Sequence, residues 1–117
     1  MEDPRLLAFK RLLDIMDELR EKCPWDSTQT IDSLRYLTIE ETYELSDAII
    51  EKDYNDLKKE LGDLLLHIVF YSKIASEGKY FDITDVANGI CEKLILRHPH
   101  IFGDEHAATA EDVRNNW

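Results

Sequence analysis

Apolar residues recur at intervals of three and four residues in successive segments of this chain, and that spacing places them along one face of an α-helix. The segments span 4–23, 29–52, 53–78 and 82–97, and a shorter one begins at 109. Only four glycines and three prolines occur among the 117 residues, which favours long helices over many short strands and turns. The sequence therefore predicts an all-α fold, a four-helix bundle-like domain with a short C-terminal fifth helix.

Polar residues three apart mark the expected helix starts. Asp26 and Gln29 have the spacing of a capping box for the second helix, and Thr109 has a capping partner three residues later in the last one. Asp53, followed by a second aspartate at 56, is the expected N-terminal cap of the third helix.

The length and composition fit a single domain over 1–117, with no repeat and no linker. The chain stops at Trp117 after barely two turns of the last predicted helix, which is typical of a piece of a longer protein. The third helix is apolar on nearly all sides after Leu61, so it needs more cover than one four-helix chain supplies. We therefore expect completion by oligomerisation, as a homodimer or larger.

The charge balance restricts the partners. The 25 acidic residues exceed the 14 basic ones, for a formal net charge of -11, which repels nucleic-acid polymers and anionic membranes. A small polyanionic ligand would need a divalent cation to screen it. The longest apolar stretch, 64–71, is far shorter than the ~20 residues that a membrane span needs, and no secretory signal precedes it. We expect a cytoplasmic protein without a membrane partner.

Two pairs of carboxylates stand out on adjacent predicted helices. Glu41 and Glu44 are three residues apart where a packing helix would carry leucine, and Glu60 and Asp63 repeat that spacing on the next helix. Four facing carboxylates would repel one another unless a cation neutralised them, and oxygen-only ligands favour Mg²⁺ or Mn²⁺. The alternative at this point is a set of solvated charges on an acidic helix face.

Longer motifs add a resemblance to a known family. They are Cys23-Pro24-Trp25-Asp26, Gln29-Thr30, Glu40-Glu41-Thr42-Tyr43-Glu44, Asp47-Ala48, Glu60-Leu61-Gly62-Asp63-Leu64-Leu65 and Arg97-His98-Pro99-His100-Ile101-Phe102. Together they resemble the MazG family of nucleoside triphosphate pyrophosphohydrolases, and in particular the first of the two copies found in longer members.

The resemblance implies an all-α enzyme that assembles as a dimer or dimer of dimers. It also implies that Glu41, Glu44, Glu60 and Asp63 are the metal ligands and the catalytic carboxylates, with Mg²⁺ as cofactor and Mn²⁺ as a substitute. The substrate would be a nucleoside triphosphate and the products a nucleoside monophosphate and pyrophosphate. Glu41 and Glu44, with Glu40 beside them, are the candidates for the base that accepts a proton from water.

Three further residues are candidates for substrate binding. Lys93 and Arg97 lie four apart on the fourth helix, where the family places residues that meet phosphates, and a guanidinium fits phosphate oxygens bidentately. The alternative is a solvated basic edge near a helix C-terminus, which the helix dipole also favours. Trp117 stands where the family has a tryptophan that packs near the base. A lone histidine on an apolar helix, such as His67, is more often a core residue than a ligand.

Two other functions compete with this hypothesis. A non-catalytic dimerisation or regulatory module would use the acidic face for protein contacts and would show neither magnesium-linked stabilisation nor turnover. A di-iron carboxylate bundle would need Glu-x-x-His motifs, whereas the partner of Glu60 in this spacing is Asp63. The sequence does not identify the preferred base or sugar, or the phosphorus that is attacked.

Overall fold

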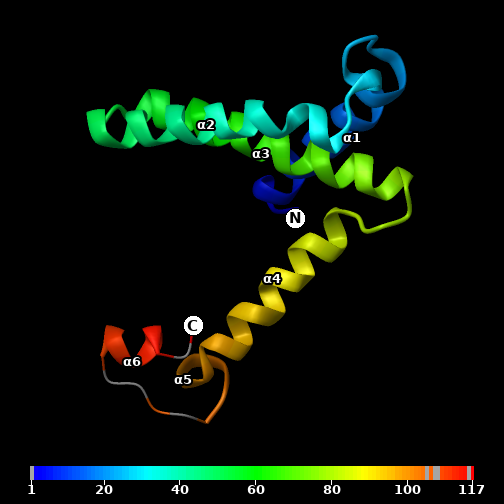
Figure 1. Ribbon diagram of the computed structural model, residues 1–117. Helices are drawn as coiled ribbons and strands as arrows, with labels where there is room; N and C mark the ends of the chain where they lie inside the picture. The colour runs from blue at the N-terminus through cyan, green and yellow to red at the C-terminus, as the bar shows by residue number, and fades with distance from the viewer. Residues whose placement is uncertain (1, 105, 107–108, 116) are drawn as a thin grey trace. The chain divides into compact units, whose positions relative to one another are not determined.

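The computed structural model describes residues 2–104, 106, 109–115 and 117, and these residues contain helices and no strand. The helical elements, coloured along the chain in Figure 1, are α1 Pro4–Lys22, the 3₁₀ turn η1 Asp26–Thr28, α2 Ile31–Glu51, α3 Tyr54–Glu77, α4 Ile83–Arg97, α5 Pro99–Phe102 and α6 Ala110–Arg114. The predicted all-α class is confirmed. The sequence pattern did not predict α5, a single turn that begins at the proline where the chain leaves α4.

The start of α2 differs from the prediction. Thr30 is its N-cap, and Thr30 and Ser33 each accept a hydrogen bond from the other's backbone N–H, at 3.0 and 2.8 Å. Asp26 instead begins η1, where its carbonyl accepts from the N–H of Gln29. The expected Asp26–Gln29 capping box was therefore wrong, because these residues close a 3₁₀ turn and Thr30 and Ser33 cap the helix.

The caps of α3 and α6 agree with the prediction. The side chain of Asp53 accepts a hydrogen bond from the backbone N–H of Asp56 at 3.1 Å, and Thr109 accepts one from Asp112 at 3.2 Å. Lys52 ends α2 in the left-handed conformation, with φ 56°. This residue and Asp53 form the short connection that turns the chain back, so α2 and α3 are antiparallel neighbours.

The chain divides into two compact units, Met1–Asp82 and Ile83–Trp117. In the first unit α2 and α3 lie side by side, and α1 contacts η1 and α3 (Figure 1). The buried core joins Met16 of α1, Leu34 of α2 and the Val69–Phe70 pair of α3. In the second unit α4 contacts α5.

Arg20 fixes the loop between α1 and α2. Its side chain is only 14% exposed, and it donates to the backbone carbonyls of Asp26 and Gln29 at 2.8 Å each while pairing with Glu77 of α3 at 2.9 Å. One guanidinium thereby holds α1, the loop and the end of α3 together.

The helices can be compared with the expectations of no membrane span and of assembly through α3. Among the described residues, none of the helices is both long and apolar enough to cross a lipid bilayer. Leu61, Leu65 and Ile68 of α3 are exposed in the single chain. The assembly and the cytoplasmic location stay predictions.

Candidate metal centre

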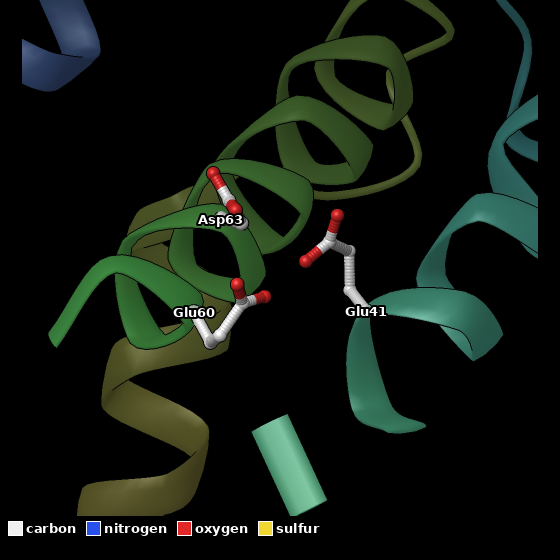
Figure 2. Close-up of side chains that lie close together, drawn as sticks. All are labelled: Glu41, Glu60 and Asp63. Carbon is white, nitrogen blue, oxygen red and sulfur yellow. The ribbon is translucent and has the colours of Figure 1, made fainter. Parts of the chain in front are cut away.

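Three of the four predicted carboxylates come together between α2 and α3. Glu41 of α2, Glu60 of α3 and Asp63 of α3 each offer a carboxylate oxygen, and these atoms all lie within 4.8 Å of one another. Figure 2 shows the Glu41 side chain extending from α2 towards the two acids on α3. The i, i+3 spacing on α3 and the antiparallel pairing with α2 bring these oxygens to one place.

The local structure explains why these side chains converge. Leu34 and Leu37 of α2 pack into the core, and Glu41 follows one turn later on the same face of the helix. On α3, Glu60 and Asp63 precede the core residues that begin with Leu66. The acids therefore lie in the same interface between α2 and α3 as the apolar core, next to it along the helices.

Two oxygens in the cluster have no hydrogen-bond partner among the described residues. Oε2 of Glu41 and Oε2 of Glu60 are buried, and no described residue hydrogen-bonds to either atom. Buried polar atoms in folded proteins are nearly always paired, so each of these oxygens needs a proton or a bound cation as its partner. A donor set made of carboxylate oxygens, one of them on the exposed Asp63, fits a hard divalent cation such as Mg²⁺ or Mn²⁺.

The crowding of acids shifts their protonation. Burial, followed by the neighbouring carboxyls of Glu41 and Glu44, raises the pKa of Glu60 to about 7. Burial also raises the pKa of Glu41, and the charges of Asp63 and Glu44 act in the same direction, while the contact with Glu60 opposes them. Without a cation, the cluster therefore retains a proton at a pH where an isolated glutamate would be ionised.

Glu44 occupies the edge of the cluster. Its side chain is exposed, and it is not one of the three acids whose oxygens converge. It is nevertheless close enough to raise the pKa of both Glu41 and Glu60. Three of the four predicted acids thus converge in the structure and Glu44 lies beside them, while the role of all four as metal ligands stays a prediction.

The predicted substrate-binding residues contact one another in the second unit. Nζ of Lys93 lies 5.5 Å from the centroid of the Trp117 ring, a cation–π distance. Arg97 donates a hydrogen bond to the backbone carbonyl of Trp117. The ring of His98 meets the same tryptophan edge to face, with centroids 5.8 Å apart. Two cations and one aromatic ring therefore form a single group.

His67 makes polar contacts that the sequence did not reveal. Its Nδ1 lies 2.7 Å from Oγ1 of Thr38 on α2, and Tyr71 contacts the same oxygen. Burial lowers the pKa of His67, and the charge of Asp63 opposes that shift. The signal for this contact was the four-residue spacing from Asp63 to His67 and from His67 to Tyr71, which places all three on one helix face.

Comparison with known proteins shows which family the chain resembles in sequence. Residues 29–102 match the family model described as the MazG nucleotide pyrophosphohydrolase domain. The chain is 46% identical over 110 residues to the nucleoside triphosphate pyrophosphohydrolase of Escherichia coli strain K12, covering 92% of this chain and 42% of that protein.

Two proteins of Thermotoga maritima are also similar. The nucleoside triphosphate pyrophosphohydrolase/pyrophosphatase MazG is 51% identical over 100 residues, which cover 84% of this chain and 39% of the relative. The crystal structure of a mazG-related protein matches with a TM-score of 0.77 and 27% identity, over 92% of this chain and 94% of that one. The chain thus spans less than half the length of the two full-length pyrophosphohydrolases, from Escherichia coli and Thermotoga maritima.

Proposed function

Because the chain belongs to the MazG nucleotide pyrophosphohydrolase family, a family of hydrolases, we propose that it hydrolyses nucleoside triphosphates to a nucleoside monophosphate and pyrophosphate. The observation that supports this most strongly is the carboxylate trio, in which no described residue hydrogen-bonds to two of the buried oxygens. Such a site is costly for a fold to maintain unless a cation uses it.

Glu41, Glu60 and Asp63 would hold Mg²⁺, or Mn²⁺ in its place, and Glu44 would complete the ligand set. A cation held there would supply positive charge against the triphosphate and would lower the pKa of water bound to it. Glu60 must release its proton before its oxygens can act as ligands, because the pKa of this carboxyl is raised to about 7. We therefore propose that cation binding and proton release are coupled.

The structure favours one of the base candidates. Glu41 is partly buried within the trio, whereas Glu44 is exposed at its edge. A carboxylate that is not fully committed to the cation can accept a proton from the attacking water, provided it lies within hydrogen-bond reach. We assign this role to Glu44.

Lys93, Arg97 and Trp117 would bind the nucleotide. Arg97 and Lys93 supply the positive charge that a triphosphate needs from a protein of formal net charge -11. Trp117 offers an aromatic face, which we propose packs near the base. In this proposal the triphosphate is the partner, nucleic-acid polymers and membranes are not, and the enzyme works as a homodimer or dimer of dimers.

The test is hydrolysis of a panel of nucleoside triphosphates with and without Mg²⁺, using the wild type and two charge-matched variants. Glu41→Gln should lose turnover, whereas Glu51→Gln should retain it, because Glu51 is an exposed acid on the same helix outside the trio. Turnover that is absent in all three proteins would favour a non-catalytic helical module. Equal turnover in all three would remove the trio from the active site.

A further inference from the structure

Thr38 of α2 joins two side chains of α3 beside the carboxylate trio. Its Oγ1 lies 2.7 Å from Nδ1 of His67, 2.5 Å from the phenol oxygen of Tyr71 and 3.2 Å from the backbone carbonyl of Leu34. All three side chains are partly buried. Thr38 precedes Glu41 by three residues, and His67 follows the last acid of the trio by four. The contact therefore lies one helical turn from the trio on both helices.

A count of protons identifies the donors. A threonine hydroxyl has one proton and two lone pairs, and the Leu34 carbonyl can only accept. If Thr38 donated its proton to His67 or Tyr71, no proton would lie between Oγ1 of Thr38 and the carbonyl oxygen of Leu34, and that contact would not be a hydrogen bond. All three contacts are hydrogen bonds only when Thr38 donates to Leu34 and accepts from both His67 and Tyr71. His67 must then carry its proton on Nδ1.

This arrangement lies at the border between two kinds of interface. On one side of Thr38 the helices are held by apolar packing of Leu34 and Leu37, and on the other lie mutually repelling acids. A fixed contact at that border limits how far Glu41 can move from the acids of α3. Such a constraint matters because a metal centre tolerates little displacement of its ligands.

We propose that Thr38 is a positioning residue of the carboxylate centre, which fixes His67 as the Nδ1–H tautomer and keeps Glu41 in register with Glu60 and Asp63. The inference rests on the proposed function, because it takes the trio as the site of the divalent cation. Thr38 touches neither substrate nor cation in this role, and it acts through the placement of α2 on α3.

The test uses a pair of substitutions that separate the hydroxyl from the shape of the side chain. Thr38→Val removes the hydroxyl, and Thr38→Ser retains it. Glu77→Gln is the control, because it weakens the ion pair with Arg20 about three turns beyond His67 on α3 and leaves the Thr38 contact unchanged. Tyr71→Phe, which removes only the phenol oxygen, serves as a second variant if Thr38→Val does not fold.

Two measurements on the nucleotide-free protein decide the outcome. Nitrogen NMR of the His67 ring should show a protonated Nδ1 and a bare Nε2 in the wild type and in Thr38→Ser, and a loss of that fixed tautomer in Thr38→Val. Titration with Mn²⁺ should show roughly tenfold weaker binding in Thr38→Val, the size expected for a lost supporting contact. Thr38→Ser and Glu77→Gln should bind Mn²⁺ as the wild type does.

The possible failures are distinguishable. A wild type that binds Mn²⁺, together with a Thr38→Val variant that binds it equally well, would overturn the positioning role alone. So would a wild-type His67 protonated on Nε2. A wild type without affinity for Mn²⁺ would overturn the proposed metal site, and the positioning role with it.

Discussion

The carboxylates of Glu41 and Glu60 meet across the interface of α2 and α3, and each retains one buried oxygen that no described residue hydrogen-bonds. Their helices are held together nearby by a core of Leu34, Val69 and Phe70. Apolar packing thus supports a polar cluster whose members repel, a combination that is characteristic of functional sites.

The raised pKa of Glu60 predicts how stability depends on pH without metal. Its carboxyl titrates at about 7 in the folded protein and near the ordinary value of 4.5 when unfolded. The folded state therefore binds this proton more tightly, so the resulting stability is full below 4.5 and is lost as pH rises to about 7. Thermal melts across that range should show a steeper decline in the wild type than in Glu60→Gln. Parallel declines would contradict the shifted pKa.

Removing a carboxylate should separate activity from folding. Glu44→Gln or Asp63→Asn relieves repulsion in the metal-free protein, so neither variant should melt markedly lower. Turnover should fall roughly a hundredfold or more, because a ligand or the base is lost. Circular dichroism and pyrophosphate release measure the two properties on one sample. A large drop in melting temperature would instead identify these acids as structural.

Phosphate recognition should be separable from metal binding. Arg97→Met and Lys93→Met retain most of the aliphatic stem and delete the charge. Loss of a charge-assisted phosphate contact should weaken nucleotide affinity or turnover by roughly ten- to a hundredfold. Mn²⁺ affinity without nucleotide should stay the same or rise, since no ligand to the cation is removed. Unchanged nucleotide affinity and turnover would leave these residues as a solvated helix edge.

Arg20 should matter for stability and not for the chemistry. Arg20→Met leaves two backbone carbonyls and Glu77 without their shared donor. The expected cost is about 2 kcal/mol of unfolding free energy, or roughly 5 to 10 °C in melting temperature. Metal affinity of the folded variant should match that of the wild type. A variant that melts like the wild type would show that the hydrogen bonds and the ion pair of Arg20 do not stabilise the loop.

Regular features of the fold could be predicted from the sequence. The periodic spacing of Leu34, Leu37 and Glu41 places them on one face of a helix, and α2 forms there. The cap at Asp53 is a local contact, and it too was predicted correctly. The start of α2 was not, because Asp26 and Thr30 both have plausible capping partners and the surrounding turn decides between them.

The candidate site was less accessible to sequence reasoning. The spacing of Glu60 and Asp63 predicted that they share a face, and the structure brings Glu41 to them. The spacing could not predict that Glu44 would lie at the edge of the trio, because its position depends on the rotation of α2 about its axis relative to α3. The contact of Thr38 with His67 depends on the same rotation. Contacts between helices follow from packing, and a single sequence specifies packing only indirectly.

Above all, we propose that the carboxylate trio serves magnesium-dependent hydrolysis of nucleoside triphosphates. The most direct measurement is phosphorus NMR of a triphosphate incubated with the wild-type chain, with Mg²⁺ and then with the metal chelated. If the trio serves this reaction, equal amounts of nucleoside monophosphate and pyrophosphate form with Mg²⁺, and the triphosphate stays unchanged without it. Release of inorganic phosphate and a nucleoside diphosphate, or hydrolysis that persists without any divalent cation, would contradict this role of the trio.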